Sequence, residues 1–450
     1  MRELTKSVIS TSWALSLFGA HQMAGIVSRP SGSDLDADST PLLDTVAKVV
    51  RSRLTNRFQH FYDLGDEAQR GMVDLVGAAT RLRLSGLLKP SIDVANPLFQ
   101  GFGLVTPQRD WLTDWQELRN KIDIFDLVQN VEARINATPE LPLSELVDRA
   151  YALGDFHALW AVEGIGHYFG EQALKKTQDP KGLLVNPASQ RVPDKSLTML
   201  NAGIGLSFAE KLLAELTTQS PEELINHVVL RFVELCKENT TAGYTGAALE
   251  SLGLVTRSFH SKLLLALDKS ILSTGNEELL GYFWHGVGRG TYFSRENFLP
   301  IPCCTIRWDS LAEQADHEIG CHNIIAGLAW AVTLVNMRTP QVMERLVRSR
   351  SHEITSVGKE AFANGVSSSI VMRQDATPHT DLVKRFCQFI PEQDATHSSL
   401  WRKWVGRSCR TANEVFHSSS RQPYPLETLF RCPQSDVTET YMEPLIVESV

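Results

Sequence analysis

Residues 162–169 read VEGIGHYF, and the two glycines in this stretch decide the fold. Gly164 and Gly166 stand inside a helical pattern, where each glycine costs about 1 kcal/mol relative to alanine. A helix tolerates glycine where a neighbouring backbone must come close, because any larger side chain would hold the two backbones apart. The stretch therefore indicates two helices that pack at short distance.

The same signature, a glycine followed by small or apolar residues, recurs along the chain. Its glycines are Gly164, Gly203, Gly243, Gly286, Gly327, Gly365 and, in a weaker copy, Gly406. The steps between them are 39, 40, 43, 41, 38 and 41 residues. Helix starts such as Pro221 and Pro340 lie between the glycines. The sequence therefore predicts an all-α protein, an array of stacked helical hairpins in units of about 40 residues, with an N-terminal helical extension.

The chain outside the repeats divides by composition. Residues 1–27 predict an amphipathic helix, residues 28–40 a linker rich in Ser, Asp, Gly and Pro, and residues 41–89 a helical hairpin. Irregular chain follows, and residues 110–450 form the helical repeat domain. Within it, only residues 300–308 have the character of an extended segment.

The N-terminal helix has three open interpretations. Residues 7–28 contain no Asp, Glu, Lys or Arg, but serine, threonine, His21 and Gln22 dilute the apolar run. The helix could dock on the protein itself, lie on a membrane surface or partner, or act as a transmembrane span or cleaved signal.

Bulk composition excludes several classes of protein. The 450 residues are 43% hydrophobic and 21% charged, which is typical of a globular chain rather than a disordered one. A net charge of −8 argues against nucleic acid as a partner. Seven cysteines without a CxxC pair indicate reduced thiols and a cytoplasmic protein, with membrane association through residues 7–27 left open.

The densest polar cluster is EQADHEIGCH, residues 313–322. On one helix, His317 and Cys321 would be neighbours four residues apart, with His322 beside them, and these side chains could supply metal ligands. In an enzyme, His317 and His322 would be the catalytic pair. Glu163 and His167 form another pair at four-residue spacing. The structural alternative is a capped, hydrogen-bonded polar patch without metal, and the sequence does not identify a cofactor.

The most aromatic stretch of the chain predicts a ligand-binding site. Trp284, His285, Arg289 and Tyr292 lie within it, and they could form an apolar pocket in which one histidine and one arginine orient a ligand. The alternative is core packing, with Arg289 at a helix end. Neither a phosphate-binding loop nor a GxSxG elbow is present in the sequence.

Four stretches resemble, in matching order, the domain of unknown function 1702, a bacterial family associated with enediyne and related polyketide biosynthetic clusters. They are residues 162–169, 243–248, 286–293 and 377–382. The resemblance spans about residues 110–420, and the copy at Gly327 departs from it by lacking a second glycine. It implies an accessory or tailoring role toward an apolar, polyene-like product, and no residue-level mechanism.

Three functions are consistent with these observations. The first is an accessory or binding protein of secondary-metabolite biosynthesis, whose helical scaffold holds a protein partner or an apolar small molecule. The second is a metal-assisted tailoring enzyme that acts on a polyene-like substrate. The third is a membrane-peripheral protein anchored by residues 7–27.

Overall fold

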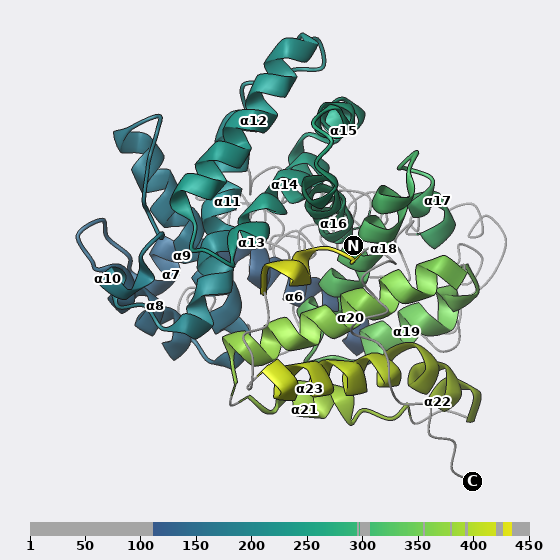
Figure 1. Ribbon diagram of the computed structural model, residues 1–450. Coiled ribbons are helices and arrows are strands. Elements are labelled where there is room, and N and C mark those ends of the chain that lie inside the picture. Colours follow the sequence, from purple (N-terminus) through teal and green to yellow (C-terminus); the bar gives the residue numbers. More distant parts are fainter. Residues whose placement is uncertain are drawn as a thin grey trace, which may run out of the picture. The chain divides into compact units, whose positions relative to one another are not determined.

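The computed structural model describes residues 111–294, 297, 307–353, 356–378, 380–391, 395–419 and 426–433 (Figure 1). The chain divides into two compact units, Met1–Asp126 and Leu127–Val450. The predicted helix 1–27, linker 28–40 and hairpin 41–89 lie outside the described residues, as do residues 300–306 of the predicted extended segment. In the first unit, a buried ion pair joins Lys121 and Glu117 within α6 (Trp111–Gln129).

The described residues are all-α and contain no strand, so the predicted fold class is confirmed. The helices that pack against one another in chain order are α9 (Asp155–Lys176), α11 (Leu197–Leu213), α13 (Thr245–Leu249) with α14 (Ser251–Phe259), α16 (Glu277–Phe293), α18 (Glu318–Val335), α20 (Ser356–Ala376) and α23 (Arg407–Ser419). The helices between them are α7 (Val131–Ile135), α8 (Leu143–Ala152), α10 (Pro187–Gln190), η3 (Asp194–Ser196), α12 (Glu222–Asn239), η4 (Ser261–Leu263), α15 (Leu264–Ser273), α17 (Trp308–Ala312), α19 (Gln341–Arg350), η7 (Ser351–Glu353), α21 (Asp381–Cys387), α22 (Ala395–Trp401), η8 (Arg402–Gly406) and η9 (Leu426–Phe430).

Glycines lie where successive long helices touch, as the sequence predicts. A Cβ atom at Gly203 would lie 1.9 Å from the carbonyl oxygen of Glu163 on the preceding long helix. A Cβ atom at Gly327 would lie equally close, 1.9 Å, to the carbonyl oxygen of His285. Real Cβ atoms do not approach backbone atoms this closely, so no residue with a side chain fits at these positions without moving a helix.

Two of the predicted repeat glycines, Gly243 and Gly406, do not lie at a close contact between long helices. Gly243 lies in the turn before α13 with φ of +83°, a left-handed conformation that favours glycine, and a Cβ there would meet nothing within 4 Å. Gly406 ends the π-helical turn η8, where a Cβ would lie 3.8 Å from the nearest atom. Gly253 of α14 instead packs against α16, since its Cβ would lie 1.8 Å from the carbonyl oxygen of Phe283. A regular unit of about 40 residues is therefore not confirmed, although helix packing through small residues is general in this chain.

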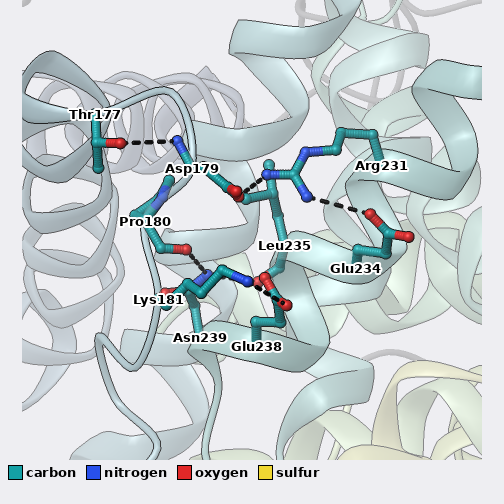
Figure 2. A network of polar contacts seen from close by, with 9 residues as sticks. All are labelled: Thr177, Asp179, Pro180, Lys181, Arg231, Glu234, Leu235, Glu238 and Asn239. Atoms are coloured by element: carbon teal, nitrogen blue, oxygen red, sulfur yellow. Dashed lines mark hydrogen bonds and ion pairs between the residues drawn. The ribbon is translucent and has the colours of Figure 1, made fainter.

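The loop after α9 is held on α12 by a group of polar contacts (Figure 2). Asn239, which is fully buried, donates from Nδ2 to the carbonyl oxygen of Pro180 at 2.7 Å. Arg231 pairs with Asp179, and Lys181 Nζ lies 3.0 Å from Glu238 Oε1. These contacts fix the connection between the first two long helices of the array.

Helix α18 is long and apolar enough to cross a membrane by length and composition alone. Within the described residues it is the single helix with this property, and 78% of its window is buried in the fold. Its place between α16 and α20 is that of a central core helix.

The C-terminal end of α20 returns to the corner between α8 and α9. Tyr151 at the end of α8 donates from its hydroxyl to the carbonyl oxygen of Ala376 at 3.0 Å. Arg373, which is buried, donates to the carbonyl oxygens of Asp155 and Phe156. The last long helix before residue 380 is thus bonded directly to the first helices of the array.

Asp375, at this junction, predicts a specific pH dependence. Burial is the main cause that raises its pKa from 3.8 to about 7, although Thr198 donates a hydrogen bond to its carboxyl. The folded protein therefore holds this proton up to about pH 7, whereas the unfolded chain releases it near pH 3.8, so stability falls as pH rises between these values. We expect Asp375→Asn to raise the free energy of unfolding by about 2 kcal/mol at pH 8, after allowance for residual solvation of the carboxyl.

Urea denaturation of both proteins at pH 4 and pH 8 checks this expectation. The difference between them should nearly vanish at pH 4, where the aspartate is protonated in the folded state. Equal differences at the two pH values would show that Asp375 does not titrate in this range.

Candidate functional site

The contacts between long helices repeat one backbone register. Five carbonyl oxygens that face a small residue of the next helix in this register belong to Glu163, Ala202, Glu250, His285 and Ala326. The small residues that they face are Gly203, Ser251, Gly286, Gly327 and Gly365. Three of the five residues that present a carbonyl oxygen carry polar side chains, and these three belong to one buried network.

Arg289 of α16 is the centre of this network. Its Nη2 lies 2.5 Å from Glu163 Oε1 of α9, and its Nη1 lies 2.9 Å from Glu250 Oε2 between α13 and α14. His285, one turn before Arg289, places Nδ1 2.7 Å from Glu250 Oε1. All four side chains are at most 3% exposed. The packing of successive helices therefore joins Glu163 to an arginine 126 residues further along the chain.

The two carboxylates of the network differ in their proton affinity. Burial raises the pKa of Glu163, and the charge of Arg289 does not fully offset that effect. Burial acts in the same direction on Glu250, but Arg289 and the hydrogen bond from His285 together lower its pKa below the ordinary value. The network holds two carboxyls and one guanidinium, and a proton on Glu163 would balance its charge.

Four buried polar atoms of this region have no hydrogen-bond partner among the described residues. They are Glu163 Oε2, His285 Nε2, Arg289 Nε and Trp330 Nε1. Trp330 of α18 belongs to the same region, because the guanidinium of Arg289 lies 4.9 Å from its ring centroid. Buried polar atoms without partners are uncommon in native proteins, and a concentration of them indicates a place for a ligand, an ion or water.

A phenylalanine from the end of the chain packs on this region. The ring of Phe430 in η9 lies 5.8 Å from the ring of Trp330 and 6.5 Å from that of His285. Two polar contacts hold the residues after Phe430 in place. The amide of Cys432 donates to Asn323 Oδ1 at 2.6 Å, and Arg431 pairs with Glu278 at 2.7 Å. The short helix thus supplies an apolar cover next to the partnerless atoms.

The structure divides the predicted ligand-binding residues. His285 and Arg289 meet through Glu250, as described above. Trp284 instead donates from Nε1 to Asp268 Oδ1 at 2.7 Å, and the hydroxyl of Tyr292 lies 2.7 Å from Asn336 Nδ2 of α18. Adjacent residues of a helix point in different directions, so Trp284 does not share the contacts of His285. The prediction that all four bind one ligand stays a prediction.

The predicted metal ligands of the 313–322 cluster make separate contacts. His317 is the N-cap of α18 rather than part of a helix with Cys321, because its Nδ1 accepts from the amide of Gly320 and its Nε2 lies 3.0 Å from Asp268 Oδ1. Cys321 Sγ lies 3.0 Å from the carbonyl oxygen of Ala312. His322 lies 3.8 Å from Glu318. The expectation of one continuous helix is wrong here, and the metal and catalytic roles of His317, Cys321 and His322 stay predictions.

Another group of possible ligands lies between α9 and α11. His167 Nε2 is 3.0 Å from Glu210 Oε2, and with Glu171 these residues place their ligand atoms within 4.8 Å of one another. The Glu163–His167 spacing was visible in the sequence, because four residues separate neighbours on one helix face. Glu210 and Glu250 had no such local signal, since each is brought to its partner by a different helix.

No protein-family model matches the chain, and no curated protein or solved structure matches it. The resemblance to the domain of unknown function 1702 therefore stays a prediction, and function has to be inferred from the geometry.

Proposed function

We propose that the interior of the helical array binds a small, largely apolar molecule, and that the protein acts as a binding or accessory protein for it. The observation that carries this proposal is the group of partnerless buried atoms on Glu163, His285, Arg289 and Trp330. Leaving such an atom without a partner costs about 1–3 kcal/mol, so their concentration in one place favours a bound group that would satisfy them.

The chemistry of the region supports a ligand with a long apolar part and a polar end. Trp330 and Phe430 offer aromatic surface, and Arg289 and His285 offer directional hydrogen bonds. Ligand sites commonly combine apolar walls with a few polar groups in this way. In the proposed complex, the apolar part takes the place of the Phe430 ring. A polyene-like biosynthetic intermediate, the ligand class that the resemblance implies, has this character.

We expect Trp330→Phe to weaken binding of a polyene probe by about 5-fold or more, because it removes an indole N–H that would bond the ligand while the aromatic ring remains. The measurement is a fluorescence titration of the purified full chain with parinaric acid, a conjugated polyene. Trp308→Phe is the matched control, since Trp308 is equally buried, also has a partnerless Nε1, and packs instead on Phe362 at 5.5 Å.

Trp330→Phe and Trp308→Phe should therefore differ in their affinity for the probe, although both replace a buried tryptophan with phenylalanine. Phe430→Ala should tighten binding, since the competing ring is gone. A wild-type protein that does not bind the probe saturably, or two tryptophan variants with the same affinity, would contradict the proposal.

The membrane-peripheral alternative rests on residues 7–27, which lie outside the described residues, so it stays a prediction. The enzyme alternative gains support from the His167 cluster, which lies on α9 one turn after Glu163.

A further inference from the structure

The cluster of His167, Glu171 and Glu210 is built where α9 and α11 pack closely against each other. His167 and Glu171 lie one turn apart on α9, and Glu210 comes from α11. Gly203 lets these helices meet, because its Cβ would lie 2.6 Å from the backbone nitrogen of His167. His167 and Glu210 are both 4% exposed, so their mutual placement is fixed by the core.

We propose that His167, Glu171 and Glu210 bind a divalent transition-metal ion, with one imidazole nitrogen and two carboxylate oxygens as ligands. Bonds of about 2.1 Å in a tetrahedral site place ligand atoms about 3.4 Å apart. The three ligand atoms already lie within 4.8 Å of one another, so small side-chain rotations complete the site. A mixed nitrogen and oxygen donor set suits Zn²⁺, Mn²⁺ or Fe²⁺ better than Ca²⁺.

Two neighbouring glutamates support the proposal. Glu132 of α7 lies near enough to Glu171 for the charge of Glu171 to contribute to its raised pKa, so carboxylates from three helices gather here. Glu163 lies one turn before His167 on the same face of α9, and its buried Oε2 has no partner among the described residues.

With the three ligands found among the described residues, an ion would keep at least one coordination position for water, substrate or a fourth ligand. Structural zinc sites are closed by four protein ligands, whereas catalytic sites keep a position for water or substrate. Three protein ligands, the number found here among the described residues, is the number that catalytic zinc sites use. This site would give the enzyme hypothesis a metal centre different from the one that the sequence predicts.

The test is metal binding by the full-length, untagged protein after chelation. Isothermal titration with Zn²⁺, and elemental analysis after dialysis, should give one ion per chain. His167→Gln should weaken Zn²⁺ binding by more than about 100-fold, a larger loss than removal of a supporting second partner causes. Glu171→Gln, at a partly exposed position, serves where the His167 variant does not fold. His317→Gln and His322→Gln are the matched controls and should keep the ion.

X-ray absorption at the zinc edge separates the two candidate sites. The proposed site has nitrogen and oxygen neighbours at about 2.0–2.2 Å, whereas a site that includes Cys321 would show sulfur at about 2.3 Å. A sulfur shell, retention of the ion by a folded His167→Gln or Glu171→Gln protein, or a wild-type protein that binds no Zn²⁺, Mn²⁺ or Fe²⁺ would each overturn the proposal.

Discussion

Gly288→Ala is expected to lower the free energy of unfolding by about 3–5 kcal/mol, at the upper end of what overpacking costs. A Cβ atom at this position in α16 would lie 2.1 Å from the carbonyl oxygen of Ile324 and 2.9 Å from the backbone nitrogen of Leu328. Both contacts are with the backbone of α18, which cannot rotate away as a side chain can. The two central helices would have to separate, and the packing along their length would be lost.

Gly281→Ala in the same helix is the matched control. Its nearest neighbours would be side-chain atoms of Arg431 and Asn323 at 3.5 Å, which is ordinary van der Waals contact. Alanine is the better helix former by about 1 kcal/mol, so this variant should be as stable as the wild type or slightly more stable. Urea denaturation monitored by circular dichroism measures both changes. Similar losses in the two variants would show that close approach of the helices is not what requires glycine.

Glu250→Gln is expected to lower stability by about 3–5 kcal/mol at pH 7, the range for breaking a buried ion pair on one side. The change leaves the guanidinium of Arg289 with Glu163 alone, and it removes the charged acceptor of His285 Nδ1. Because the pKa of Glu250 is lowered in the folded state, its contribution is present above the ordinary value of 4.5 and is lost as pH falls through the lower folded pKa. The deficit of the variant should therefore shrink in acid.

Glu163→Gln should behave differently although Glu163 binds the same guanidinium. Its pKa is raised, so the proton that it holds stabilises the folded state in acid, and that contribution is lost as pH rises through the folded pKa. We expect this variant to lose less stability at pH 7 than Glu250→Gln, since burial disfavours the ionised form of Glu163 and a glutamine carries no charge. The free energy of unfolding of Glu163→Gln, relative to that of the wild type, should rise as pH rises. Chemical denaturation across pH 4–9 measures both variants, and parallel curves would contradict the opposite pKa shifts of Glu163 and Glu250.

The fold class could be predicted from the sequence because the cost of glycine in a helix is local. Gly203, Gly286 and Gly327 could be recognised as helix contacts without knowing their partners. Gly243 could not be distinguished from them, since a glycine in a left-handed turn looks the same in a list of spacings. The start of α21 was also predictable, because Thr380 carries its own capping hydroxyl and accepts from the amide of Leu382 at 3.2 Å.

The candidate sites were harder to predict from the sequence, because they depend on which helices pack against one another. His285 and Arg289 share a helix face, and that could be deduced from their spacing. Their carboxylate partners come from α9 and from the junction of α13 and α14, and no local pattern relates these segments to α16. The EQADHEIGCH cluster was predicted to lie on one helix, but α18 begins after His317. Residues that are close in sequence on the two sides of a helix start do not share a helix face.

The bonds that join Tyr151 and Arg373 across the α8–α20 junction limit how the number of helices in such a protein can change. In an open solenoid, each unit touches its neighbours alone, so units can be gained or lost while the remainder folds independently. Here, insertion or deletion of a pair of helices between α9 and α20 would shift Ala376 away from Tyr151 and leave the guanidinium of Arg373 buried without its carbonyl partners. Helices cannot be gained or lost between α8 and α20 without breaking these bonds, so we expect residues 143–376 to unfold in a single cooperative transition.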